Sequence, residues 1–191
     1  MGKGRLEAFT DGVMAIIITI MVLEIKVPAR PDLAALQASA PVLAAYALSY
    51  ANVGIFWNNH HHMLHATHRI NGQVLWANLA LLFSLSLLPL AINWMGESAF
   101  APLPTASYAA VLILASVSYL ALELAIVRAD PANEALAKAI GREFKGKLSL
   151  ALYIAALALA FVKPWMAIGV YVLVAAMWFI PDRRIESNLD T

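Results

Sequence analysis

Charged and hydroxyl side chains open the sequence directly before an apolar stretch of membrane length. Residues 5–23 read RLEAFTDGVMAIIITIMVL, so that Arg5, Thr10 and Asp11 precede the apolar run that begins at Val13. An ionisable group inside a membrane span costs about 2.5 kcal/mol or more, so such groups usually face the interior of a helix bundle and pair. These residues predict either a solvated cap at a helix end or a buried polar network.

A second group of reactive side chains contains every histidine of the chain. The segment NNHHHMLHATHR holds His60, His61, His62, His65 and His68. His61, His65 and His68 share one helical face, a spacing that can bind a divalent metal. A membrane di-iron enzyme needs further clusters on other helices, and no histidine stands elsewhere. We therefore exclude an enzyme and expect neither a resident metal nor a cofactor, whereas a metal transporter stays open.

The composition is that of an integral membrane protein. Of 191 residues, 62% are hydrophobic and 13% charged, and the mean hydropathy is +0.73. Soluble domains are about half apolar and about a quarter charged. The formal net charge of +1 argues against a nucleic-acid partner, because such binding requires a clustered basic surface. The absence of cysteine excludes disulfides and thiolate sites.

Six apolar segments are long enough, or nearly so, to cross the roughly 30 Å hydrocarbon core of the lipid bilayer as helices. They are residues 9–27, 36–60, 74–94, 106–127, 148–162 and 165–180. The last two are short and separated only by Lys163 and Pro164, which predicts a tight helical hairpin. The sequence therefore predicts one all-α transmembrane domain over residues 1–191, with six membrane-spanning helices.

The basic residues predict the orientation of these helices. If the N-terminus is cytoplasmic, one side of the membrane receives ten of the thirteen Lys and Arg residues: Lys3, Arg5, Arg69, Arg128, Lys138, Arg142, Lys145, Lys147, Arg183 and Arg184. The other side receives Lys26, Arg30 and Lys163. Because cytoplasmic loops carry an excess of Lys and Arg, we expect both termini to be cytoplasmic and the protein to lie in the cell (plasma) membrane.

The first segment has two different faces when it is drawn as a helix. One stripe collects apolar side chains, with Thr19 at its flank: Phe9, Gly12, Ile16, Ile20, Leu23 and Val27. Asp11 lies about 140° from Ile16 and so belongs to another face. The stripe is consistent with lipid contact or bundle packing. This is the ordinary role of an apolar membrane helix, and the alternative is a constriction that excludes water when several subunits bring this helix to one axis.

The spacing of these residues resembles a family signature. The pattern Arg5-x-x-x-Phe9-Thr10-Asp11-Gly12, followed by Ile16-Ile17-Ile18-Thr19 and Val22-Leu23, resembles the opening of bacterial members of the transmembrane protein 175 family of potassium channels. The resemblance continues with Trp57-x-x-His60-His61, Asn78 and Pro89. The family usually has serine at the position of Thr10, and threonine keeps the hydroxyl.

The resemblance implies a homotetramer in which the first helix of each six-helix subunit lines a central pore without a separate filter loop. It assigns the pore constriction and gate to Ile16, with Ile20 and Leu23 as further apolar rings, and a selectivity-related hydroxyl ring to Thr19. It implies a structural polar network of Arg5, Thr10, Asp11, His60 and Asn78. Potassium would be the permeant ion, and its discrimination from sodium would be modest.

Two other functions remain open on the sequence. A proton-coupled or divalent-metal transporter would use Asp11 and the cluster from His60 to His68. A non-conducting membrane assembly protein would use neither. At the outer end of the first helix, Glu24 would attract cations, and the adjacent Lys26 would offset its field.

Overall fold

The structure, a computed structural model, describes residues 2–133 and 144–179. Every regular element in these two ranges is a helix, which confirms the all-α prediction: α1 (Lys3–Leu23), α2 (Leu33–Ala38), α3 (Ala40–His65), α4 (Gly72–Ser86), α5 (Leu88–Glu97), α6 (Pro102–Ala129), α8 (Phe144–Val162) and α9 (Pro164–Phe179). Five spans are long and apolar enough to cross a membrane, with α4 and α5 counted as one from Gly72 to Glu97. The helix α9 is apolar but has only 16 residues.

The helix ends follow local chemistry. Asp32 caps α2 by accepting a hydrogen bond from the Ala35 backbone N–H at 2.7 Å, and Asn71 caps α4 in the same way. Pro89 stands in the first turn of α5 and provides no backbone N–H, which accounts for the break between α4 and α5.

Several predicted boundaries differ from the helices. The first helix runs from Lys3 to Leu23 and not from Phe9 to Val27, and the charged residues Glu24 and Lys26 follow its end. The helix α3 continues to His65, past the predicted end at His60.

The second predicted span begins at Leu36, which belongs to the short helix α2, and α3 begins at Ala40 with a proline in its first turn. Pro41 has no N–H to donate to the Gln37 carbonyl oxygen, so the hydrogen bonds of α2 do not continue into α3. Pro28 disfavours helical backbone angles at Val27, the predicted end of the first helix.

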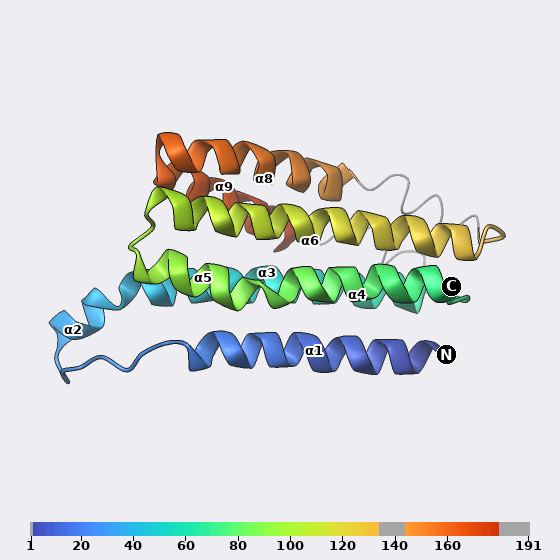
Figure 1. Cartoon of the computed structure of the whole chain (residues 1–191), viewed down its shortest axis with the longest axis horizontal. Coiled ribbons are helices and arrows are strands. Elements are labelled where there is room, and N and C mark those ends of the chain that lie inside the picture. The colour runs from blue at the N-terminus through green and yellow to red at the C-terminus, as the bar shows by residue number, and fades with distance from the viewer. Residues whose placement is uncertain (1, 134–143, 180–191) are drawn as a thin grey trace.

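The helices lie side by side along one axis (Figure 1), and α1 occupies one edge of the bundle. Its contacts are with α3, α4 and α5, whereas α6 packs against α4, α5, α8 and α9. The interior is apolar and closely packed, and its fully buried side chains include Met14, Leu64, Leu81, Tyr108 and Leu112. The first helix is therefore attached through one side only.

The loops gather at two opposite ends of the bundle. The N-terminus, the α3–α4 turn and the end of α6 lie at one end, and the α1–α2, α5–α6 and α8–α9 connections lie at the other (Figure 1). The helices thus alternate in direction as the predicted topology requires. Four of the basic residues used for that prediction, Lys138, Arg142, Arg183 and Arg184, lie outside the described residues, as does Ile180, the end of the last predicted span.

Candidate functional site

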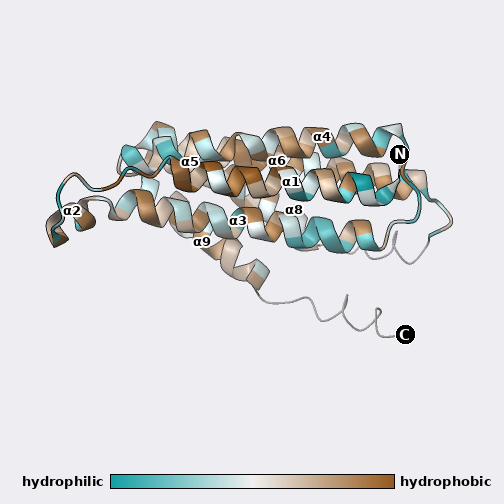
Figure 2. Ribbon diagram, turned by 90° about the horizontal axis from the view of Figure 1, so that it is seen from below, coloured by the Kyte–Doolittle hydropathy of each residue, from teal (hydrophilic) through white to brown (hydrophobic). Residues whose placement is uncertain are grey.

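The helix α1 has one buried side and one exposed side. The buried side consists of Leu6, Thr10, Met14, Ile17 and Met21, which repeat every three or four residues and face α3, α4 and α5. Figure 2, in which the bundle is seen from below, shows α1 in front of its neighbours with apolar residues along most of its length. An apolar helix with one side free of intrachain packing needs either lipid or another protein surface to cover it.

The exposed side carries the predicted stripe. Ile16 is 58% exposed and Leu23 is 80% exposed, and Phe9 and Ile20 are exposed as well. The exposed residues run the full length of the helix, so they form a continuous apolar surface and not a local patch. Val27, which the sequence also assigned to this stripe, lies beyond the end of α1.

Thr19 belongs to the same exposed side. Its hydroxyl donates a hydrogen bond to the Ile16 carbonyl oxygen at 2.8 Å, one helical turn earlier. A hydroxyl that donates to its own helix keeps both oxygen lone pairs. The Thr19 oxygen can therefore act as an acceptor or as a weak cation ligand at the exposed surface.

A buried chain of hydrogen bonds joins three helices behind this stripe. The Asn78 Nδ2 on α4 donates to the Thr10 hydroxyl on α1 at 2.9 Å, and the Asn78 Oδ1 lies 2.7 Å from the His60 Nε2 on α3. All three residues are buried. Because an amide oxygen only accepts, His60 must carry its proton on Nε2 in this arrangement. The chain fixes the position of α1 relative to α3 and α4.

Asp11 lies outside that chain and contacts α3 separately. Its carboxylate accepts a hydrogen bond from the indole Nε1 of Trp57 at 2.8 Å. The structure therefore joins Thr10, His60 and Asn78 as expected, directs Asp11 to a second partner, and leaves Arg5 exposed on the outer side of α1. Within one chain, the structure does not bring Arg5 to the other four residues of the predicted network.

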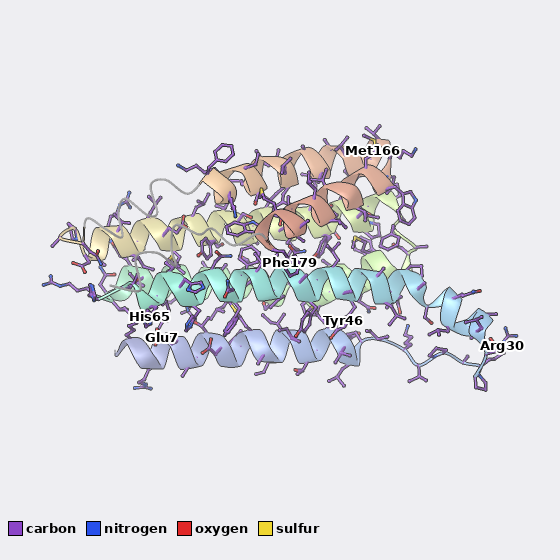
Figure 3. All side chains as sticks on the ribbon, turned by 180° about the vertical axis from the view of Figure 1, so that it is seen from behind. Glu7, Arg30, Tyr46, His65, Met166 and Phe179 are labelled. Atoms are coloured by element: carbon purple, nitrogen blue, oxygen red, sulfur yellow. The ribbon has the colours of Figure 1, made fainter. Side chains whose placement is uncertain are left out.

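The histidine cluster lies on α3, next to these contacts with α1 and toward the N-terminal end of the bundle. The His61 ring stacks between those of Trp57 and His65, with centroid distances of 5.8 and 6.2 Å. Lys3 donates a hydrogen bond to the His65 carbonyl oxygen, and Glu7, one turn along α1, lies near the same end (Figure 3). In residues 2–133 and 144–179, no group of three or more His, Asp or Glu side chains is placed to hold a metal ion.

Polar contacts also attach the opposite end of α1. Lys26 forms an ion pair with Glu97, which raises the pKa of Lys26 through the hydrogen bond and the charge of that carboxylate. The Asn93 amide donates to the Glu24 carboxylate at 3.3 Å. Glu97 is therefore the main partner of Lys26, and the charge of Glu24 acts on Lys26 more weakly. That Lys26 offsets the field of Glu24 at the mouth stays a prediction.

Sequence reasoning missed the partners Trp57, Asn93 and Glu97. Trp57 was recognised only as part of the Trp57-x-x-His60-His61 pattern. A signal was present, since an indole N–H in a membrane helix needs an acceptor and Asp11 is an acidic residue in a neighbouring span. No comparable signal connected Lys26 with Glu97, which lies 71 residues further along the chain.

Comparison with known proteins agrees with this geometry. Residues 5–89, which contain α1 and the buried hydrogen-bond chain, match the family described as endosomal/lysosomal potassium channel TMEM175. A protein of Chryseobacterium sp. (strain P1-3) named as a potassium channel is 51% identical over 189 residues, which cover 99% of this chain and 98% of that protein. The human endosomal/lysosomal proton channel TMEM175 is 35% identical over 134 residues, which cover 63% of this chain and 26% of the human protein.

A solved structure has the same fold. The crystal structure of a lysosomal potassium-selective channel TMEM175 homolog from Chamaesiphon minutus superposes with a TM-score of 0.81 at 27% identity and covers 93% of this chain and 96% of that one. The family is described as a channel and not as an enzyme. From the near full-length identity to the Chryseobacterium protein, together with this shared fold, the chain belongs to the TMEM175 family and is a multi-pass membrane protein.

Proposed function

We propose that the chain is a potassium-permeable cation channel whose pore forms where the exposed sides of several α1 helices meet. The observation that carries this proposal is the continuous exposed stripe of Ile16, Ile20 and Leu23 on a helix that is otherwise well attached. Three bacterial relatives are named as potassium channels, which supports potassium as the permeant ion.

Association of subunits is part of the proposal. One helix cannot enclose a pore, and the stripe would be covered if copies of α1 surrounded a common axis. We adopt a homotetramer of six-helix subunits in which residues 1–191 form a single channel domain. The short helix α9 would complete the sixth span, since its ends can be extended by snorkelling side chains and local bilayer thinning.

The Ile16 ring would act as the gate. A narrow passage lined by branched apolar side chains expels water when it closes. An ion is then excluded, because the dry passage offers nothing that replaces its hydration shell. Ile20 and Leu23 would extend this apolar passage toward the outside. The four Thr19 oxygens next to the constriction would replace part of the hydration shell, which favours potassium only modestly over sodium.

The polar contacts behind the stripe would hold the gate in position. Thr10 is attached to Asn78 and His60, and Asp11 to Trp57, so none of these groups is needed for coordination of the permeant ion. Arg5 would contribute only in the assembled channel. The excess of Lys and Arg at the N-terminal end of the bundle supports cytoplasmic termini, and we place the channel in the cell (plasma) membrane.

Flux measurements with the purified protein in liposomes test this function. A channel passes potassium down its gradient with no coupling ion, so uptake should be the same at equal and at unequal proton concentrations across the membrane. Dependence of uptake on an imposed proton or sodium gradient would contradict the channel and support the transporter. Absence of any flux from a stable oligomer would support a non-conducting assembly protein.

A further inference from the structure

A cavity lies on the far side of the subunit from the exposed stripe of α1. It is enclosed by α3, α6, α8 and α9 and has a free volume of about 40 Å³. Its walls include the rings of Phe56, Tyr119, Tyr153 and Trp178, and Gly146 of α8 forms part of its edge. None of the residues that we assign to the pore or to its polar network lines this cavity.

The described helices beside the cavity differ in length. The helix α3 has 26 residues and α9 has 16, so they extend about 39 and about 24 Å respectively. Figure 3 shows the end of α9 at Phe179 above the middle of α3, whereas His65 marks the far end of α3. The cavity lies between Asn52 and Asn59 in the second half of α3, beside Trp178 in the last turn of α9.

The polar groups in the cavity wall already have partners. The Asn52 amide donates to the Leu48 carbonyl oxygen and to the Tyr108 hydroxyl, and the Trp178 indole donates to the Ser149 hydroxyl at 3.0 Å. The Asn59 amide donates to the Ile55 carbonyl oxygen. What remains at the surface of the cavity is mainly aromatic and aliphatic carbon. Apolar cavities of this kind stay dry and take apolar ligands.

A basic side chain, Lys145, stands beside the wall of the cavity. Lys145 and Lys147 flank Gly146 in the sequence, and the Lys145 ammonium lies 5.7 Å from the centre of the Trp178 ring that forms part of the wall. Basic pockets between transmembrane helices bind anionic lipid headgroups. An apolar interior with a basic edge matches the two parts of an anionic phospholipid.

We propose that this cavity binds one acyl chain of an anionic phospholipid from the adjacent leaflet, with the headgroup phosphate beside Lys145 and Lys147. The free volume admits a few methylene groups of the chain, and the rest of the lipid would lie in the leaflet outside the cavity. This site is separate from the pore, so its occupation does not depend on the proposed channel function.

Native mass spectrometry of the full chain, purified in detergent and stripped of lipid, tests the site. Dioleoyl phosphatidylglycerol or dioleoyl phosphatidylcholine is added, and the lipid retained per subunit is measured. Wild type should retain one phosphatidylglycerol under conditions that remove phosphatidylcholine. Gly146→Leu should fill the cavity and weaken retention about tenfold, the equivalent of about two buried methylene groups. A Cβ at Gly146 meets nothing within 4 Å, so the variant should fold.

The controls separate this site from ordinary lipid contact. Gly169→Leu introduces the same side chain on α9 at an equally open position that does not line the cavity, and it should retain lipid as wild type does. Ser116→Leu, which enters the cavity from α6, should reproduce Gly146→Leu, and Lys147→Gln should reduce the preference for phosphatidylglycerol. Equal retention in all variants, equal loss in Gly146→Leu and Gly169→Leu, or no preference between the two lipids in wild type would overturn the proposal.

Discussion

The helix α1 and the contact between α3 and α5 are held together in different ways. At Gly96 the backbones of α5 and α3 come so close that an added Cβ would lie 2.9 Å from the Val42 Cα, whereas a Cβ at Gly12 of α1 would meet nothing within 4 Å. The position of α1 depends instead on directional polar contacts at Thr10, Asp11 and Lys26. The distance between α3 and α5 is therefore set by the volume of the side chains between them. The position of α1 is set by a few hydrogen bonds together with one narrow stripe of buried side chains.

Removal of the Asn78 side chain should have the largest effect on the attachment of α1. In Asn78→Leu, the buried Thr10 hydroxyl and the His60 imidazole both lose their partner, which should cost about 2–4 kcal/mol of unfolding free energy. Thermal unfolding in detergent measures the loss, and size-exclusion chromatography measures the release of subunits. Ser84→Ala, which removes a hydrogen bond between α4 and α6, should lower stability without dissociation. Equal effects on assembly would contradict a special role of the Asn78 chain.

Gly96→Ala tests the role of volume in the inner bundle. Its Cβ would force α5 away from the Val42 backbone, with an expected destabilisation of about 1–3 kcal/mol. Gly54→Ala on α3 is the matched control, because a Cβ there meets nothing within 4 Å. It should stabilise the helix by about 0.5–1 kcal/mol. Both values come from thermal unfolding, and an unchanged midpoint for Gly96→Ala would show that α3 and α5 are not limited by backbone contact.

The sequence predicted the helices of both regions, but not the contacts that hold α1 in place. Apolar runs predicted each long helix, because a membrane span must be apolar over its whole length. The period of 3.6 residues predicted which side chains of α1 share a face, and the structure shows that this face is exposed. The hydrogen bond between Asp11 and Trp57 joins residues 46 positions apart, and it depends on how two helices are rotated against each other. No pattern within either helix specifies that rotation.

Arg5 is a residue for which the family pattern was less informative than the helix period. It was expected in the polar network, but a helical wheel puts it about 20° from Ile16, and it is exposed on that side of α1. The helix period alone could therefore have separated Arg5 from Thr10. Assignment through the family pattern did not make this distinction, because a shared motif gives residue types and not their directions within one subunit.

Trp57→Phe should have a smaller effect, because the hydrogen bond to Asp11 lies at an exposed position. Loss of a charge-assisted hydrogen bond there should cost about 1 kcal/mol, measured as a lower unfolding midpoint. Trp76→Phe, at a largely exposed tryptophan of α4, provides the control and should leave the midpoint unchanged. The same destabilisation in Trp76→Phe would mean that ring size, and not the bond to Asp11, is responsible.

Lys26→Gln should have the smallest effect. The ion pair with Glu97 is exposed, and exposed ion pairs contribute little to stability and are screened by salt. Because the pKa of Lys26 is raised, its contribution is present at neutral pH and is lost only when the pH rises through that pKa. Thermal unfolding at low and high salt should show a small difference from wild type that vanishes at high salt. A difference that persists at high salt would contradict a screened surface pair.

The most direct measurement is potassium flux into liposomes that contain Ile16→Asn, compared with Leu114→Asn. Both side chains are exposed near the middle of a membrane-length helix, but only Ile16 lies on the proposed pore stripe. An amide at the constriction should keep it wet and raise the potassium leak well above wild type, while Leu114→Asn should conduct as wild type does. Equal flux in the two variants, with both assembled as wild type, would contradict a pore lined by the exposed side of α1.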